Sequence, residues 1–158
     1  MRLSGTRPSR DGVVPAGEPL THSELERFVA AQRPAYDGAL RELRSGRKTG
    51  HWMWFVFPQI EGLGQSKMSR FYAIASLDEA AAYLAHPVLG ARLRECATAI
   101  IAIEGRSAAQ ILGEIDATKL HSSMTLFHRA APDEAVFRDV LDRYFAGIAD
   151  PATDERLG

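Results

Sequence analysis

The residues best suited to bind or transform a small molecule surround one dense aromatic run. Trp52 to Phe57 form an unbroken series of six large apolar residues, and the polar residues His51 and Gln59 lie on either side of it. Amphipathic surface elements alternate or repeat at helical spacing, so we predict that this run is buried. An imidazole beside indole rings can exchange protons with a ligand or orient it. A structural role is the alternative, in which His51 and Gln59 bond backbone groups freed at Pro58.

A hydroxyl-rich turn in the last third of the chain is the second candidate. Lys119 precedes Ser122 and Ser123 by one helical turn, so an ammonium group and two hydroxyls share one face of a predicted helix. Serine and threonine are mediocre helix formers, and with Thr125 there are three of them in a helix interior. Such groups suit anion binding or, with stricter geometry, a serine nucleophile activated by lysine. The alternative is that small residues permit close helix packing.

Positive charge is concentrated near the aromatic run. Residues 41–70 contain six Lys or Arg against two Asp or Glu, a local net charge of +4; the whole chain has −1, which leaves −5 for the rest. This asymmetry can attract an anion, although a solvated basic turn produces the same pattern. Ser66 and Arg70 of this region are candidate donors. The loop 62–66 lacks the Gly-x-x-x-x-Gly-Lys-Ser/Thr spacing of a phosphate-binding loop.

The composition excludes several classes of protein. The chain has 158 residues, a net charge of −1 and an ordinary content of apolar and charged residues, as expected for one globular domain. The near-zero charge argues against general attraction to nucleic acid, and no stretch approaches the roughly 20 apolar residues that cross a membrane. Cys96 is the only cysteine, and the histidines lack metal-ligand spacing. We therefore predict a cytoplasmic protein without a metal or other cofactor.

The first residues of the chain differ in composition from the rest. Residues 1–19 are rich in Gly, Pro, Ser and Arg and contain little to bury. We expect them to form a flexible leader, followed by one domain over residues 20–158. Thr21 and Glu24 form a capping box at the start of the first helix. Pro34 is predicted to interrupt this helix and to begin a second one.

Cap residues and apolar spacing predict helices along the rest of the chain. The aromatic run would also suit a buried strand, but a lone strand leaves its backbone groups unbonded, so we predict a short buried helix. No other regular element is expected between residues 47 and 75. Further helices are predicted to begin at Ser76, Pro87, Ser107, Asp116 and near Val136, the last of them ending at Gly147. The sequence therefore predicts an all-α fold.

Motifs along most of the chain carry a family resemblance. They are Arg27-Phe28-Val29-x-x-Gln32, His51 to Gln59, Gly62-Leu63-Gly64-x-Ser66, Tyr72-Ala73-Ile74, Tyr83-Leu84-x-His86-Pro87-Val88-Leu89-Gly90, Asp116-x-x-Lys119-Leu120-x-Ser122-Ser123-Met124-Thr125-Leu126-Phe127 and Asp150-x-x-Thr153. From about residue 24 onward the chain resembles the mostly bacterial domain of unknown function 1810 family, some of whose members are labelled calpastatin without support. The resemblance implies a single multihelical domain, a bundle of longer helices capped by shorter ones, and no established activity. His121 departs from it, because a plain surface residue is expected there.

We predict that the aromatic run and the hydroxyl-rich turn meet across one concavity that binds a small anionic ligand, such as a nucleotide. Tryptophan faces stack on bases, and lysine, arginine and hydroxyl groups bind phosphates. The candidate ligand-binding residues are His51, Trp52, Trp54, Gln59, Ser66, Arg70, Lys119, Ser122 and Ser123. No set of nucleophile, base and orienting residue is evident, so the sequence predicts no reaction. The alternatives are a non-catalytic interaction module and a weak nucleic-acid binder.

Overall fold

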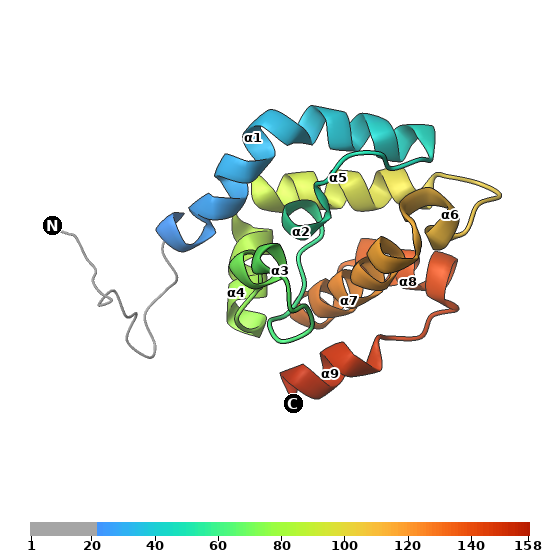
Figure 1. Ribbon diagram of the computed structural model, residues 1–158. Helices are drawn as coiled ribbons and strands as arrows, with labels where there is room; N and C mark the ends of the chain where they lie inside the picture. Colours follow the sequence, from blue (N-terminus) through green and yellow to red (C-terminus); the bar gives the residue numbers. More distant parts are fainter. Residues whose placement is uncertain (1–21) are drawn as a thin grey trace, which may run out of the picture.

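Nine helices and no strand make up residues 22–158, the part of the chain that this computed structural model describes (Figure 1). The longer helices are α1 (His22–Ser45), α5 (Leu89–Ile101), α7 (Glu114–Ala130) and α8 (Ala135–Phe145). The shorter ones are α2 (Met53–Val56), α3 (Lys67–Phe71), α4 (Leu77–Ala85), α6 (Ala108–Leu112) and α9 (Pro151–Leu157). The prediction of an all-α domain, with longer helices capped by shorter ones, is confirmed.

Helices α5 and α7 hold the domain together. α5 packs against α1, α4 and α8, while α7 packs against α4, α6, α8 and α9. The core between them contains Phe28, Leu93, Ile100, Phe127 and Phe137, which are all fully buried or nearly so. Burying one such side chain stabilises a fold by about 1.5–3 kcal/mol. Among the described helices, none is both long and apolar enough to cross a membrane.

The first helix is longer than the sequence predicted. α1 continues through Pro34, so the prediction that this residue separates two helices was wrong. Proline removes one backbone hydrogen bond and bends a helix, and Figure 1 shows α1 changing direction midway along its length. The helix persists because Tyr36 and Leu40, in the turns after the bend, are buried in the core. The predicted capping box at Thr21 and the predicted leader lie outside the described residues.

The aromatic run forms the predicted short buried helix, α2. Two buried side chains from other helices bond its backbone. Gln32 Nε2 donates to the Phe55 carbonyl at 2.7 Å and to the Tyr83 hydroxyl at 3.0 Å, and the Tyr83 hydroxyl donates to the same carbonyl at 3.5 Å. These bonds hold α2 between α1 and α4, and so fix the position of both tryptophans relative to the bundle.

Two short helices were not predicted. α3 begins after Ser66, whose Oγ accepts a hydrogen bond from the Ser69 amide at 3.1 Å. α9 follows Asp150, whose Oδ2 accepts from the Thr153 amide at 3.1 Å, with proline in its first turn. The helix predicted to stop at Gly147 is α8, which does end there, after Phe145, but it is not the last helix of the chain. α7 begins at Glu114, two residues before the predicted start at Asp116.

The junction of α4 and α5 is unusually close. A Cβ atom added to Gly90 would lie 2.1 Å from the Leu84 carbonyl oxygen and 2.8 Å from Arg94 Nη1. His86 closes the turn between the helices, since its Nδ1 accepts hydrogen bonds from the Val88 and Leu89 amides at 3.1 and 3.2 Å. Glycine is required at residue 90 because its neighbours leave no room for a side chain.

Candidate functional site

A cavity of about 540 Å³ lies beside the aromatic run, between α2 and the start of α7. We call it the Trp54 hollow. It is lined by Lys48, His51, Met53, Trp54, Leu112, Gly113, Glu114, Ile115 and Asp116. Its walls come from the loop after α1, from α2, and from the junction of α6 with α7. The hollow thus joins three segments that are distant in sequence.

Two lysines meet one carboxylate at this site. Lys48 Nζ lies 2.8 Å from Asp116 Oδ2, and Lys119 Nζ lies 3.3 Å from Asp116 Oδ1. Only 8% of the Lys48 side chain and 17% of the Lys119 side chain are exposed. Charges removed from water in this way interact more strongly than surface charges. The three groups together carry a net charge of +1, and Glu114, which also lines the hollow, offsets it.

Each lysine also lies over one of the two tryptophans. Lys48 Nζ is 5.0 Å from the centroid of the Trp52 ring, and Lys119 Nζ is 5.0 Å from that of Trp54. Both distances are within the range of cation–π attraction. The aromatic run therefore contacts the start of the hydroxyl-rich turn through Trp54 and Lys119. The rest of the turn points elsewhere.

Glu42 organises the loop that carries Lys48. Its Oε1 accepts hydrogen bonds from the Thr49 amide at 2.8 Å, the Gly50 amide at 2.9 Å and Trp52 Nε1 at 2.9 Å. Burial raises the pKa of Glu42, but these hydrogen bonds outweigh it and lower the pKa to about 2. The ionised carboxylate thereby fixes both the loop and the indole of Trp52.

The N-terminus of α7 faces the same hollow. No side chain among the described residues caps it, and Gly113, which precedes it, has φ 89° and ψ 158°, a backbone region open almost only to glycine. The first amide groups of a helix lack intrahelical partners and carry a partial positive charge. Residues 113–116 line the hollow, so this end of α7 adds to its attraction for anions.

The predicted site residues of the aromatic run have different environments. His51 and Trp54 line the hollow, His51 being exposed and Trp54 partly buried. Trp52 is only 3% exposed and lies behind the hollow, bonded to Glu42. Gln59 is partly buried, and its backbone carbonyl accepts a hydrogen bond from the Ile74 amide at 2.8 Å.

Ser66 and Arg70 lie apart from the hollow, on the exposed helix α3. Ser66 caps this helix and Arg70 is in its last turn. Arg27 of α1 holds the end of α3, since its Nε donates to the Phe71 carbonyl at 2.9 Å. Neither Ser66 nor Arg70 lines the Trp54 hollow.

The hydroxyl groups of α7 bond the C-terminal segment of the chain. Ser122 Oγ donates to Asp150 Oδ2 at 3.0 Å, and Thr125 Oγ1 accepts from the Asp150 amide at 2.9 Å. Thr153 Oγ1 donates to the same carboxylate oxygen at 2.6 Å. Ser123 Oγ is buried without a hydrogen-bond partner among the described residues. The anion that meets Ser122 is thus the chain's own Asp150, whereas Lys119 meets Asp116.

His121, which departs from the family pattern, contacts the segment that follows α8. Its Nε2 is 2.7 Å from the Ile148 carbonyl, and its ring stacks on Phe145 with the centroids 4.1 Å apart. It therefore joins α7 to the segment between α8 and α9, just before Asp150.

Replacing Asp150 with Ala is expected to lower the free energy of unfolding by about 1–2 kcal/mol, because α9 loses its N-cap and Ser122 loses one of its two acceptors. Urea denaturation measures this change, and hydrogen exchange of the 152–157 amides locates it. Asp150→Asn is the matched control, because asparagine also caps helices well, and it should cost less. Equal losses for both variants would contradict the assigned capping role.

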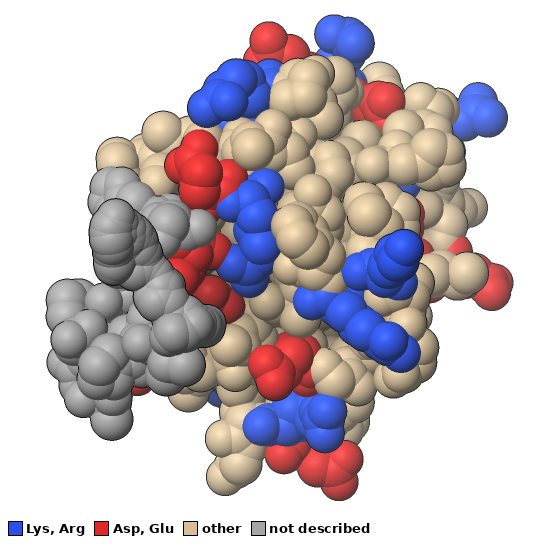
Figure 2. Space-filling view, turned by 60° about the vertical axis from the view of Figure 1, so that its left-hand side comes forward, with Lys and Arg blue, Asp and Glu red and all other residues tan. Residues whose placement is uncertain are grey.

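The predicted excess of positive charge does not form one patch. Arg41 and Arg44 belong to α1, Lys48 is nearly buried, and Lys67 and Arg70 belong to α3. Figure 2 shows basic side chains in separate groups on one face, with acidic side chains and wide uncharged areas among them. The basic side chains of residues 41–70 are therefore spread over separate parts of the structure.

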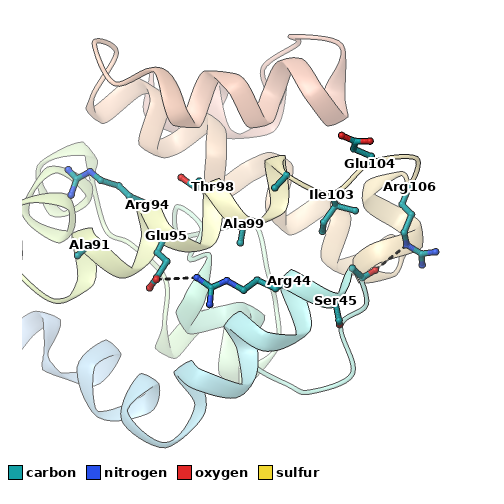
Figure 3. A pocket seen from close by; sticks show the side chains of 12 residues that line it. Arg44, Ser45, Ala91, Arg94, Glu95, Thr98, Ala99, Ile103, Glu104 and Arg106 are labelled. Atoms are coloured by element: carbon teal, nitrogen blue, oxygen red, sulfur yellow. Dashed lines mark hydrogen bonds and ion pairs between the residues drawn. The ribbon is translucent and has the colours of Figure 1, made fainter.

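A larger cavity of about 850 Å³ lies over α5, next to the end of α1 (Figure 3). Three arginines line it, and each is already bonded. Arg44 pairs with Glu95 at 3.5 Å, Arg94 bonds Glu134 at 2.7 Å, and Arg106 donates to the Gly46 carbonyl at 3.1 Å. None of the predicted site residues lines this cavity. The Trp54 hollow is the candidate functional site because two predicted site residues, His51 and Trp54, line it.

Sequence reasoning missed three residues that shape the hollow. Lys48 was considered only as part of a basic turn, and Glu42 only as one of two acidic residues among six basic ones. Asp116 was considered as a helix start and as part of a family motif, but not as a site residue. The spacing of Asp116 and Lys119 by three residues in a helix signals that they can pair. Nothing in the sequence indicates that Lys48, 68 positions before Asp116, is the other partner.

Comparisons with known proteins extend over almost all of the described chain. Residues 22–157 match the family model described as "Protein of unknown function (DUF1810)". Among solved structures, the chain is similar to the conserved hypothetical protein Rv1873 from Mycobacterium tuberculosis, with 49% sequence identity and a TM-score of 0.85. That match covers 87% of this chain and 98% of the other. No curated protein matches the chain.

Proposed function

The chain belongs to the DUF1810 family of proteins of unknown function, and on this premise we propose that it binds a small anionic ligand in the Trp54 hollow. The observation that carries the proposal is the arrangement of Lys48 and Lys119 around Asp116, beside a partly exposed tryptophan and an open cavity. Ligand sites typically combine apolar and aromatic walls with a few convergent polar groups.

The two lysines differ in how firmly they are held. Lys48 is nearly buried and lies 2.8 Å from Asp116, whereas Lys119 is more exposed and lies 3.3 Å away. Lys119 can therefore turn toward an incoming anion at a smaller cost. His51 and the first amides of α7 offer further donors at the edge of the hollow. Trp54 provides a surface on which a flat group can stack.

A thermal-shift screen of nucleotides, sugar phosphates and organic anions tests the proposal, followed by calorimetric titration of each hit. At least one anion is expected to raise the melting temperature of the unaltered protein. Trp54→Ala and Lys119→Ala should each weaken its binding about tenfold, the effect of losing roughly 1.4 kcal/mol of interaction.

Matched controls come from α3, outside the hollow. Phe71→Ala removes an exposed aromatic side chain and Lys67→Ala an exposed ammonium group, and both should leave the affinity unchanged. If no anion stabilises the unaltered protein, or if all four variants bind equally well, the proposed function is wrong. Circular dichroism of each variant verifies that it is folded.

A further inference from the structure

The balance of charge in the Trp54 hollow restricts the class of ligand. Resting on the proposed function, we propose that the ligand is an organic monoanion with a flat apolar body, such as an aromatic carboxylate. On this proposal, nucleotides and sugar phosphates, which carry two or more negative charges, bind less well. The inference comes from the charged side chains at the hollow and from the apolar residues that line it.

Positive and negative side chains at the hollow are equal in number. Lys48 lines the hollow and Lys119 adjoins it through Asp116 and Trp54, and these two supply two positive charges. Glu114 and Asp116, which line the hollow, supply two negative charges. The uncapped end of α7 adds about half a positive charge. One negative charge can be accommodated by these groups. A phosphate monoester carries about −1.5 to −2 at neutral pH, so it would be repelled by Glu114 and Asp116.

The remaining lining residues are uncharged and mostly apolar. Trp54 and Ile115 provide most of this surface, and Ile115 is 76% exposed although it is large and hydrophobic. Met53 and Leu112 lie beneath it and are buried. Covering Ile115 and the exposed part of the Trp54 ring removes apolar surface from water, which favours binding. A ligand that is only a charged group would leave this surface uncovered. The hollow therefore suits an anion attached to an apolar body.

The volume of the hollow is consistent with one such molecule. At about 540 Å³ it lies within the range of small-ligand sites, roughly 300–1,000 Å³. The carboxylate would meet Lys119 and the amides at the start of α7, and the body would lie along Trp54 toward Ile115. Because Lys119 is over the Trp54 ring, these two parts of the site are adjacent.

Three probes with one shared body test the charge requirement in the full-length protein. They are 2-naphthoate, with one negative charge, 2-naphthamide, with none, and 2-naphthyl phosphate, with nearly two. Calorimetric titration should show 2-naphthoate binding at least about tenfold more tightly than either of the others. Ile115→Ala should weaken the binding of 2-naphthoate about threefold, because the apolar body loses part of its contact surface.

A charge variant tests the reason for the discrimination. Glu114→Gln removes one negative charge from the hollow. The ratio of the affinity for 2-naphthoate to that for 2-naphthyl phosphate should therefore fall about threefold. Glu104→Gln, which removes an exposed carboxylate outside the Trp54 hollow, is the matched control and should not change it.

The outcomes separate this inference from the proposed function. If 2-naphthyl phosphate or a nucleotide binds more tightly than 2-naphthoate, and Trp54→Ala weakens that binding, the ligand class is wrong and the proposed function stands. If the neutral amide binds as tightly as the carboxylate, no anion is required and both fail. If no anion of any class binds, the proposed function itself is overturned.

Discussion

Replacing Glu42 with Ala is expected to lower the free energy of unfolding by about 3 kcal/mol. The carboxylate accepts hydrogen bonds from two backbone amides and from the indole of Trp52. Each buried donor left without a partner costs about 1–3 kcal/mol, and partial access of water to the two amides keeps the sum near the lower end. Urea denaturation at neutral pH, monitored by circular dichroism, measures the loss.

The pKa of Glu42 makes this contribution depend on pH. Its pKa is about 2 in the folded protein and 4.5 in the absence of these interactions. Because the folded pKa is the lower one, the carboxylate stabilises the fold fully above about pH 4.5 and progressively less as the pH falls toward 2. The stability difference between the unaltered protein and Glu42→Gln should therefore shrink over this interval.

Comparison with Glu42→Gln separates the pH-dependent contribution of Glu42 to stability from that of the other carboxylates. Hydrogen bonds from Arg94 and Arg129 lower the pKa of Glu134 and Asp154, so these groups also lose stabilising charge in acid. They are present in both proteins and cancel in the difference. A difference that stays constant from pH 7 to pH 3 would show that the charge of Glu42 is not what stabilises the loop.

Gly90→Ala is expected to destabilise the protein by about 3 kcal/mol. The added Cβ would lie 2.1 Å from the Leu84 carbonyl oxygen and 2.9 Å from its carbonyl carbon, so α4 and α5 must move apart. Overpacking of this kind typically costs about 1–3 kcal/mol, and the contact here is with backbone, which cannot rotate away. Thermal and urea denaturation both report the change.

Gly38→Ala in α1 is the matched control. Its Cβ would meet only Arg41 Nη2, at 3.6 Å, which is ordinary contact. Since glycine weakens a helix interior, this variant should be more stable than the unaltered protein by about 0.5–1 kcal/mol. If both glycine variants changed stability in the same direction by the same amount, the close approach at Gly90 would not be its cause.

The parts of the fold that could be predicted are those marked by both a cap and a buried face. Ser76 and Ser107 precede helices with buried residues, and both caps are present. Ser66 and Asp150 are equally good caps, but α3 buries no residue fully and α9 buries only Thr153. Apolar spacing was therefore too weak to indicate these two helices.

Pro34 shows why a strong local rule can fail. The bond lost at proline costs a helix about 3 kcal/mol, which favours a break in an isolated segment. In the folded chain, the residues beyond it are buried against α5, and this burial holds them in helical conformation. No pattern within residues 22–45 reveals that α5 is there.

The candidate site was predictable only in part. The family resemblance is confirmed, and Trp54 does contact Lys119, as expected if the aromatic run and the hydroxyl-rich turn meet. The sequence did not indicate that Ser122 would bond a carboxylate 28 residues further along, in a segment where no helix was expected. Ligand binding by the nine candidate residues stays a prediction.

Both indole rings of this protein lie at one place. Trp52 is shielded from water behind the hollow, while Trp54 is partly exposed and lines it. The tryptophan fluorescence of the protein therefore originates beside the hollow. In Trp52→Phe the single remaining tryptophan is the ring that a ligand would touch. With excitation that only tryptophan absorbs, the wavelength and intensity of its emission would report ligand binding without an attached dye.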